Sequence, residues 1–286
     1  MKHISTLIVI FVIGIFAFAS TKLTRHNTVK AQTTEHATAP QQESHHKNSH
    51  KSRCSNRTGS GTYGYQMNGS IIGVGPFLVN GIFTANPNGT TSAKVRLTLN
   101  GNTIPATGTN GTFTTNDDCT GTGKFFVPEL NQQILYSFIL TDNGDEITLI
   151  NTNPGIVLQG HGKRIAPAYR RPNCGSQMVL GDYGYRLEGS LPGVANVAAA
   201  GLLTHLSGGR IIGFDAASFN GAQVPRRDYQ GTYKLNRDCT GTGNYKDSLG
   251  TTVDYVFTVV EEGKEIFLQG ANGNGDNVFG VAQRTN

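Results

Sequence analysis

Residues 116–123 read Asn-Asp-Asp-Cys-Thr-Gly-Thr-Gly, and residues 236–243 read Asn-Arg-Asp-Cys-Thr-Gly-Thr-Gly. The segment Gly-Thr-Tyr-Gly-Tyr at 61–65 likewise returns as Gly-Asp-Tyr-Gly-Tyr at 181–185, again 120 residues later. This spacing is too long for a solenoid unit of about 20–50 residues, but it matches a self-sufficient domain of about 100–150 residues. The sequence therefore predicts two copies of one domain.

The matching residues also set the domain boundaries. The offset slips by one at Phe138 and Phe257, and it is restored near the end of each copy. We expect the first copy to span 54–165 and the second 174–286, joined by a linker at 166–173.

The N-terminus has the pattern of a secretory signal peptide. Lys2 precedes an apolar run from Leu7 to Ala19 that ends in a small-residue cleavage pattern. A spanning helix needs about 20 apolar residues, so we predict a signal peptide at 1–19 and an exported protein without a later transmembrane segment. The alternative is an uncleaved anchor.

Residues 20–53 contain little that could be buried, and a disordered polar linker is expected there. Residues 1–53 hold seven Lys and Arg and two Glu, a net charge equal to the +5 of the whole chain. The folded part is then neutral overall, which argues against a nucleic-acid partner. The linker's five histidines admit metal binding, but a solvated linker is the simpler interpretation.

The four cysteines repeat with the same offset. An exported chain meets an oxidising compartment, which favours disulfides. Of the three possible connectivities, the duplication favours Cys54–Cys119 and Cys174–Cys239. The sequence has no Cys-x-x-Cys pair or nearby histidine pair, so we expect no metal site in the folded part.

Short alternating runs between turn signals dominate both copies, and helical periodicity is nearly absent. We predict an all-β protein of two tandem antiparallel β-barrels with about eight strands each, because closure removes exposed sheet edges. A sandwich is the alternative. The strands expected in the first copy are Thr62–Gly69, Leu78–Ala85, Ala93–Leu99, Gly111–Asn116, Gly121–Val127, Gln133–Thr141, Glu146–Asn151 and Val157–Gly162.

The order of these motifs resembles bacterial allene oxide cyclase-like barrel domains. Both copies carry a cysteine, Gly-x-Tyr-Gly-Tyr, Asp-Cys-Thr-Gly-Thr-Gly and a final Gly-x-Glu-Ile strand. The resemblance implies a small calycin-like barrel with an apolar interior. It also implies that a member with activity is a cyclase or isomerase that needs no cofactor.

Few residues are candidates for catalysis. Glu146 and Glu265 open matched strands, where a carboxylate at a barrel mouth could orient water or polarise a substrate. The alternative is a solvent-facing hairpin exit. His205 replaces Ala85 and would give the second barrel a base, unless it is a surface or rim histidine. Asp118 and Asp238 are expected to bond neighbouring backbone amides.

Tyrosine pairs are expected to line or fill each barrel: Tyr63 with Tyr65, and Tyr183 with Tyr185. Glu265, Tyr185 and His205 are thus the catalytic candidates. The ligand-binding candidates are Tyr63, Tyr65, Glu146, Tyr183 and Arg186. Charge favours a functional mouth in the second copy, through Arg186, Glu188, Arg210, Asp215, Arg226, Arg227 and Asp228.

No nucleophile elbow, phosphate loop or nucleotide fingerprint is present. We therefore expect an exported module that binds a small apolar or amphipathic molecule without a cofactor. The alternatives are a cofactor-free cyclase or isomerase, which would act by shaping a flexible substrate, and a structural surface protein with filled barrels.

Overall fold

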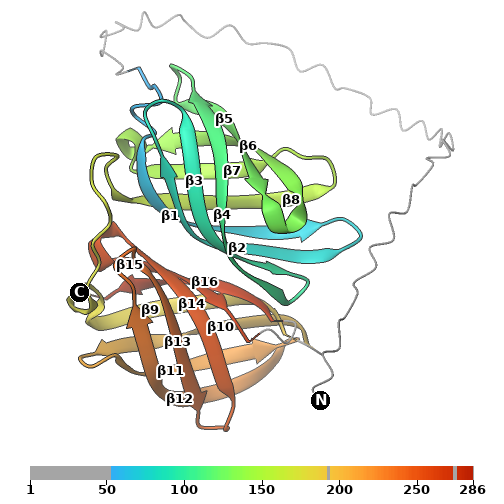
Figure 1. The fold of residues 1–286 in the computed structure, drawn as a ribbon. Helices are drawn as coiled ribbons and strands as arrows, with labels where there is room; N and C mark the ends of the chain where they lie inside the picture. Colours follow the sequence, from blue (N-terminus) through green and yellow to red (C-terminus); the bar gives the residue numbers. More distant parts are fainter. Residues whose placement is uncertain (1–52, 192–193, 273–275, 286) are drawn as a thin grey trace, which may run out of the picture. The chain divides into compact units, whose positions relative to one another are not determined.

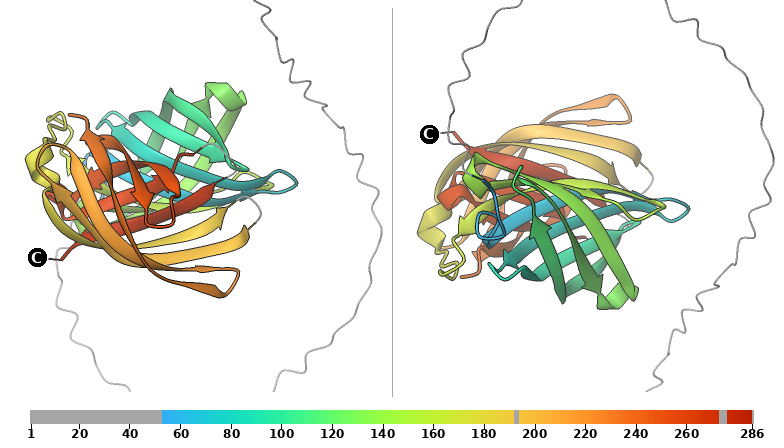
Figure 2. Two further views of the ribbon diagram at one scale, coloured as in Figure 1. Left: turned by 90° about the horizontal axis from the view of Figure 1, so that it is seen from below. Right: turned by 90° about the horizontal axis from the view of Figure 1, so that it is seen from above.

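The computed structural model describes residues 53–191, 194–272 and 276–285, and it contains two closed eight-strand antiparallel barrels (Figure 1). Both sheets curl round on themselves in the views of Figure 2. The predicted fold class is confirmed. The expected signal peptide and all of the expected linker except Arg53 lie outside the described residues. The first barrel consists of β1 (Gly61–Ile71), β2 (Gly75–Ala85), β3 (Thr90–Leu99), β4 (Asn102–Thr115), β5 (Thr120–Val127), β6 (Gln132–Thr141), β7 (Glu146–Asn151) and β8 (Ile156–Ala166).

The second barrel repeats this order, and β9 closes it by pairing with both β10 and β16. Short 3-10 turns are the helical elements among the described residues: η1 (Pro128–Leu130), η2 (Asp142–Gly144), η3 (Ser176–Val179) and η4 (Glu261–Gly263). Within that part of the chain, no helix has the length and hydropathy needed to cross a membrane. The strands are β9 (Gly181–Leu191), β10 (Val194–Leu206), β11 (Arg210–Phe219), β12 (Ala222–Leu235), β13 (Thr240–Asp247), β14 (Thr252–Val260), β15 (Glu265–Gly270) and β16 (Asn277–Arg284).

Strand β4 begins at Asn102, well before the expected start at Gly111, and it runs through Pro105; β12 begins at Ala222 and runs through Pro225. The register slips between Val95 and Leu97 opposite β4, and between Asp215 and Ala217 opposite β12. A β-bulge accommodates a residue without an N–H, so the strand continues past the proline.

The repeated Thr-Gly-Thr-Gly motif serves packing. A Cβ added at Gly241 or Gly243 would overlap the ring of Phe257 or Tyr255, and the first barrel repeats this arrangement. The glycines therefore let aromatic rings lie flat against the inner wall. The preceding Asp238 accepts hydrogen bonds from the Thr240 amide (3.1 Å) and hydroxyl (2.6 Å), as Asp118 does from Thr120. These aspartates thus stabilise turns, as predicted.

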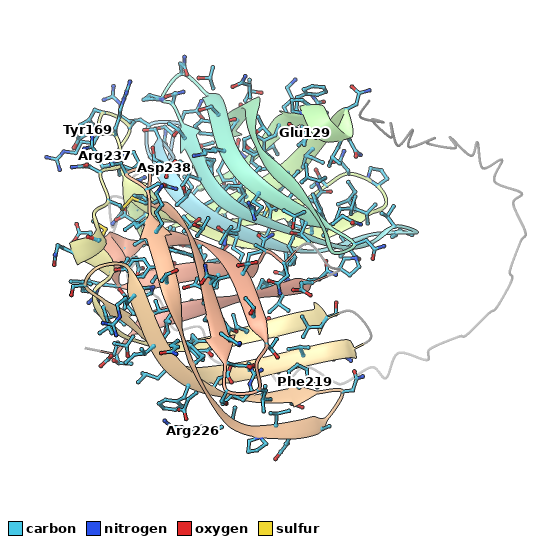
Figure 3. All side chains as sticks on the ribbon, turned by 60° about the horizontal axis from the view of Figure 1, so that its bottom comes forward. Glu129, Tyr169, Phe219, Arg226, Arg237 and Asp238 are labelled. Atoms are coloured by element: carbon cyan, nitrogen blue, oxygen red, sulfur yellow. A yellow bond between two sulfur atoms is a disulfide. The ribbon has the colours of Figure 1, made fainter. Side chains whose placement is uncertain are left out.

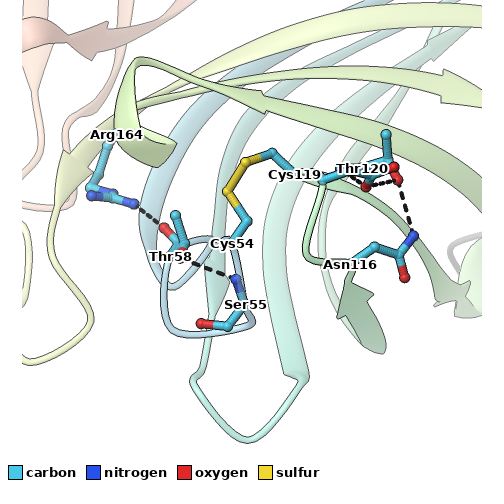
Figure 4. The surroundings of a disulfide bond; sticks show 8 residues. Cys54, Ser55, Thr58, Asn116, Cys119, Thr120 and Arg164 are labelled. Atoms are coloured by element: carbon cyan, nitrogen blue, oxygen red, sulfur yellow. Dashed lines mark hydrogen bonds between the residues drawn. A yellow bond between two sulfur atoms is a disulfide. The ribbon is translucent and has the colours of Figure 1, made fainter. Parts of the chain in front are cut away.

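A disulfide ties the lead-in of each barrel to this turn. Cys54 bonds Cys119, and Cys174 bonds Cys239, which is the pairing that the duplication predicts. Figure 4 shows the first bridge beside Thr58, whose carbonyl accepts a hydrogen bond from Arg164. Two disulfides indicate an oxidising, extracytoplasmic environment.

Each barrel has its own apolar core, and both belong to one compact unit. Polar side chains connect them. Thr258 donates to the Asn80 Oδ1 at 2.6 Å, and Gln66 donates to the Leu268 carbonyl at 2.7 Å. Both contacts are buried, so separating the barrels would leave polar groups without partners.

Candidate functional site

The second barrel encloses a cavity of about 610 Å³ between its inner wall and one end. Leu191, Phe219 and Thr252, which lie at strand ends, and Asn272, which follows β15, are among the residues that line it. Phe219 and Asp238 lie at opposite ends of this barrel (Figure 3). The volume falls within the range of about 300–1,000 Å³ that small-molecule sites occupy.

Smaller side chains make room for this cavity. Val197 and Ala199 of β10 line it, whereas the equivalent positions of the first barrel hold Phe77 and Val79. Both of those larger side chains are buried in the first core. These two differences between the copies thus leave fewer side-chain carbon atoms in the second core, next to the cavity.

A buried ion cluster forms part of the cavity wall. The Arg227 guanidinium donates to both carboxylate oxygens of Asp215, at 2.9 and 2.8 Å, and to Asp247 at 3.1 Å. The side chains of Asp215 and Asp247 are each only 1% exposed. Burial would lower the Arg227 pKa, but the bonds to Asp215 outweigh it and the pKa is raised. Arg227 therefore stays charged and neutralises part of the cluster.

The cluster is specific to the second copy. Asp215 pairs with Arg227 across β11 and β12, whereas the equivalent pair across β3 and β4 is Val95 with Thr107. Asp247 likewise stands where the first barrel has Val127. A barrel of this fold is thus built without these charges, which makes them candidates for function.

Tyrosine side chains line most of the remaining polar wall. Tyr185 donates to Asp215 at 2.9 Å, and Tyr229 donates to the Leu202 carbonyl at 3.0 Å. The Tyr255 hydroxyl is buried and has no hydrogen-bond partner among the described residues. Burial is the main cause that raises the pKa of Tyr185 and of Tyr255, so both hydroxyls stay protonated.

Of the catalytic and ligand-binding candidates proposed from sequence, Tyr185 lines the cavity and the others lie elsewhere; of the charged residues expected at a mouth of the second copy, Asp215 and Arg227 line it. Tyr65 packs in the first core. Tyr63 and Tyr183 donate to the Gly144 and Gly263 carbonyls at the disulfide end of each barrel, both at 2.6 Å. Arg186 lines a separate hollow of about 920 Å³ between the barrels.

His205 lies in the core of the second barrel rather than at its surface or rim. The residue is 2% exposed, and its ring packs edge-on against Tyr183 and Tyr233. Neither ring nitrogen has a hydrogen-bond partner among the described residues. Burial, with a smaller contribution from Arg284, lowers the pKa of His205 to about 4.

This burial predicts a pH dependence of stability. The folded-state pKa of His205 lies below the unfolded value near 6.5. The neutral His205 ring therefore contributes its full share to the folding stability above about pH 6.5. This contribution is lost as pH falls toward 4, and the wild type should lose about 3 kcal/mol more than the variant His205→Ala across that interval. Urea unfolding of both proteins at several pH values measures the difference. Parallel pH profiles would contradict the assignment.

Glu265 belongs to an ion cluster between the barrels. Its side chain is 5% exposed and accepts hydrogen bonds at 3.1 Å from both Lys163 of the first barrel and Gln283. Lys163 also contacts Glu261 at 2.8 Å and Glu146 at 3.5 Å. The alternative of a solvent-facing hairpin exit is therefore wrong for Glu265 and correct only in part for Glu146, whose side chain is 44% exposed.

We expect Lys163→Met to lower the free energy of unfolding by about 2 kcal/mol, because it leaves the Glu265 carboxylate buried without its cation. The double variant Lys163→Met/Glu265→Gln removes the stranded charge and should recover at least half of the loss. Chemical denaturation of the three proteins measures both values. A double variant less stable than Lys163→Met would contradict this account.

Among the residues that the structure describes, no group of three or more His, Cys, Asp or Glu side chains is arranged to hold a metal ion.

No protein-family model matches this sequence, and no curated protein matches it at a significant level. One solved structure that is similar belongs to a protein of unknown function from the DUF3598 family of Nostoc punctiforme PCC 73102. The two chains are 11% identical, the likeness covers 80% of this chain and 97% of that chain, and the TM-score is 0.23. The two eight-strand barrels fit a β-barrel family, and the allene oxide cyclase-like assignment stays a prediction.

Proposed function

We propose that this is an exported protein whose second barrel binds a small amphipathic molecule. The cavity of about 610 Å³ carries the proposal, because its wall combines apolar side chains with a few convergent polar groups. The disulfides and the expected signal peptide support export. The resemblance to allene oxide cyclase-like barrels is compatible with a ligand inside the barrel.

Binding fits the cavity better than the two alternatives do. A structural protein with filled barrels has no need for the replacement of Phe77 and Val79 by smaller residues in the second copy. A cyclase or isomerase would need an acid or base that exchanges protons near neutral pH. Tyr185 is the catalytic candidate that lines the cavity, and its raised pKa makes its hydroxyl a hydrogen-bond donor and a poor proton-transfer group.

Filling the cavity tests the proposal. The variant Val197→Phe/Ala199→Val copies the first barrel, and N-phenylnaphthylamine serves as an uncharged fluorescent probe. We expect the wild type to bind the probe and the filled variant to bind it at least about tenfold more weakly. The matched control is Ala198→Val, which enlarges a neighbouring side chain on the exposed face of the same strand. A folded variant that binds the probe as the wild type does would contradict the proposal.

A further inference from the structure

The charge of the cavity wall is unbalanced. Asp215 and Asp247 both bind the guanidinium of Arg227, which gives this ion cluster a net charge of −1, and Asp276 adds a further carboxylate elsewhere on the cavity wall. Asp215, Arg227 and Asp276 line the cavity directly, and Asp247 lies behind Arg227. No other charged side chain is among the described residues that line this cavity.

Hydrogen bonds to neighbouring carboxylates already occupy most of the Arg227 guanidinium. Three of its nitrogens donate to Asp215 and Asp247, and Asp215 also accepts from Tyr185. A ligand carboxylate would therefore bring a further negative charge into a cluster that is negative already. In a buried site with little solvent screening, this like-charge repulsion opposes an anionic ligand and attracts a cation.

Asp276 is the carboxylate least neutralised by a neighbour. It is 7% exposed, and the neutral side-chain amide of Asn272 donates a hydrogen bond to it at 2.5 Å. Burial is the main cause that raises the pKa of Asp276. A cation beside it would compensate the cost of burying its charge.

Aromatic faces complete the site. Tyr185, Tyr229, Tyr245 and Tyr255 all line the cavity, and Tyr229 and Tyr245 lie with ring centroids 4.6 Å apart. The faces of such rings attract cations within about 6 Å. The Tyr255 residue is 8% exposed, and its unpartnered hydroxyl offers an oxygen that can accept a hydrogen bond.

From this combination we propose that the second barrel selects a small organic cation: an ammonium group carried on an apolar body. The inference rests on the proposed function and names its ligand class. The apolar body packs against Val197, Ala199 and Leu203, and the ammonium group lies between the tyrosine rings and the carboxylates.

The test compares three compounds that share one apolar body: phenylpropylamine, phenylpropanol and phenylpropanoate. Calorimetry at neutral pH measures their affinities for the full exported chain with its disulfides formed. We expect the amine to bind at least about tenfold more tightly than the acid, with the alcohol between them. An acid that binds as tightly as the amine would overturn the proposal, and so would an amine no better than the alcohol.

The variant Asp276→Asn separates charge from shape, because asparagine keeps an oxygen for the Asn272 amide. The amine should lose affinity by several fold while the alcohol is unaffected. An equal loss for all three compounds would contradict a charge-based preference. If N-phenylnaphthylamine binds but none of the three compounds does, the cation inference fails and the binding function stands. If that probe does not bind either, the proposed function itself fails.

Discussion

Replacing Cys174 and Cys239 by alanine is expected to lower the free energy of unfolding of the second barrel by about 4 kcal/mol. The bridge closes a loop with a sequence separation of 65 residues, and the chain-entropy model assigns about 4 kcal/mol to a loop of that size. Both cysteines are buried in the second core, and alanine in their place adds no unpaired polar group. Urea denaturation of the oxidised wild type and the variant measures the loss.

The first barrel supplies the matched control. Cys54 and Cys119 have the same separation of 65 residues and occupy the equivalent place. The variant Cys54→Ala/Cys119→Ala should therefore lose a similar amount, about 4 kcal/mol. A loss below about 1 kcal/mol in both variants would show that the bridges follow from the native fold without stabilising it.

Most of the fold prediction rests on the internal sequence repeat. A motif that returns with one offset implies that both copies bury the same positions, so the period-2 alternation of one copy supports that of the other. The misplaced start of β4 shows where this reasoning fails. Pro105 excludes a regular ladder position, but sequence alone does not show that a bulge absorbs it.

The candidate site was predictable only in part. The charge pattern predicts a site in the second copy and the tyrosine alternation predicts Tyr185, but from sequence Asp215 and Arg227 are expected at a charged mouth and not inside the barrel. In β11, Asp215 shares its face with the buried Ile211, and in β12, Arg227 shares its face with Tyr229. Reading each charge against its strand's alternation would have identified both as inward-facing.

The misplaced candidates failed for a different reason. Glu265 and His205 are on the expected strands, but their environment depends on the contacts made by other segments. Lys163 of the other barrel forms an ion pair with Glu265, and the rings of Tyr183 and Tyr233 pack against His205. Such contacts between distant segments have no local sequence signal.

Arg227→Met is expected to lower the free energy of unfolding by about 3–5 kcal/mol, because it leaves Asp215 and Asp247 buried without their cation. Both carboxylate side chains are 1% exposed, so water cannot replace the guanidinium. The Tyr185 hydroxyl compensates only part of the Asp215 charge. The loss is measured by urea unfolding, and it should shrink at low pH, where the stranded carboxylates become protonated.

A triple variant separates the ion cluster from the fold. Asp215→Val and Arg227→Thr copy Val95 and Thr107, and Asp247→Asn keeps the oxygen that accepts the Leu249 and Thr251 amides. This variant strands no charge, so its stability should lie within about 2 kcal/mol of the wild type. It should also lose part of the preference for phenylpropylamine over phenylpropanoate, because Asp276 alone then remains as a carboxylate in the cavity wall. A triple variant as unstable as Arg227→Met would mean that the second barrel needs the cluster in order to fold. A stable triple variant that keeps the preference would place recognition of the ammonium group outside the cluster.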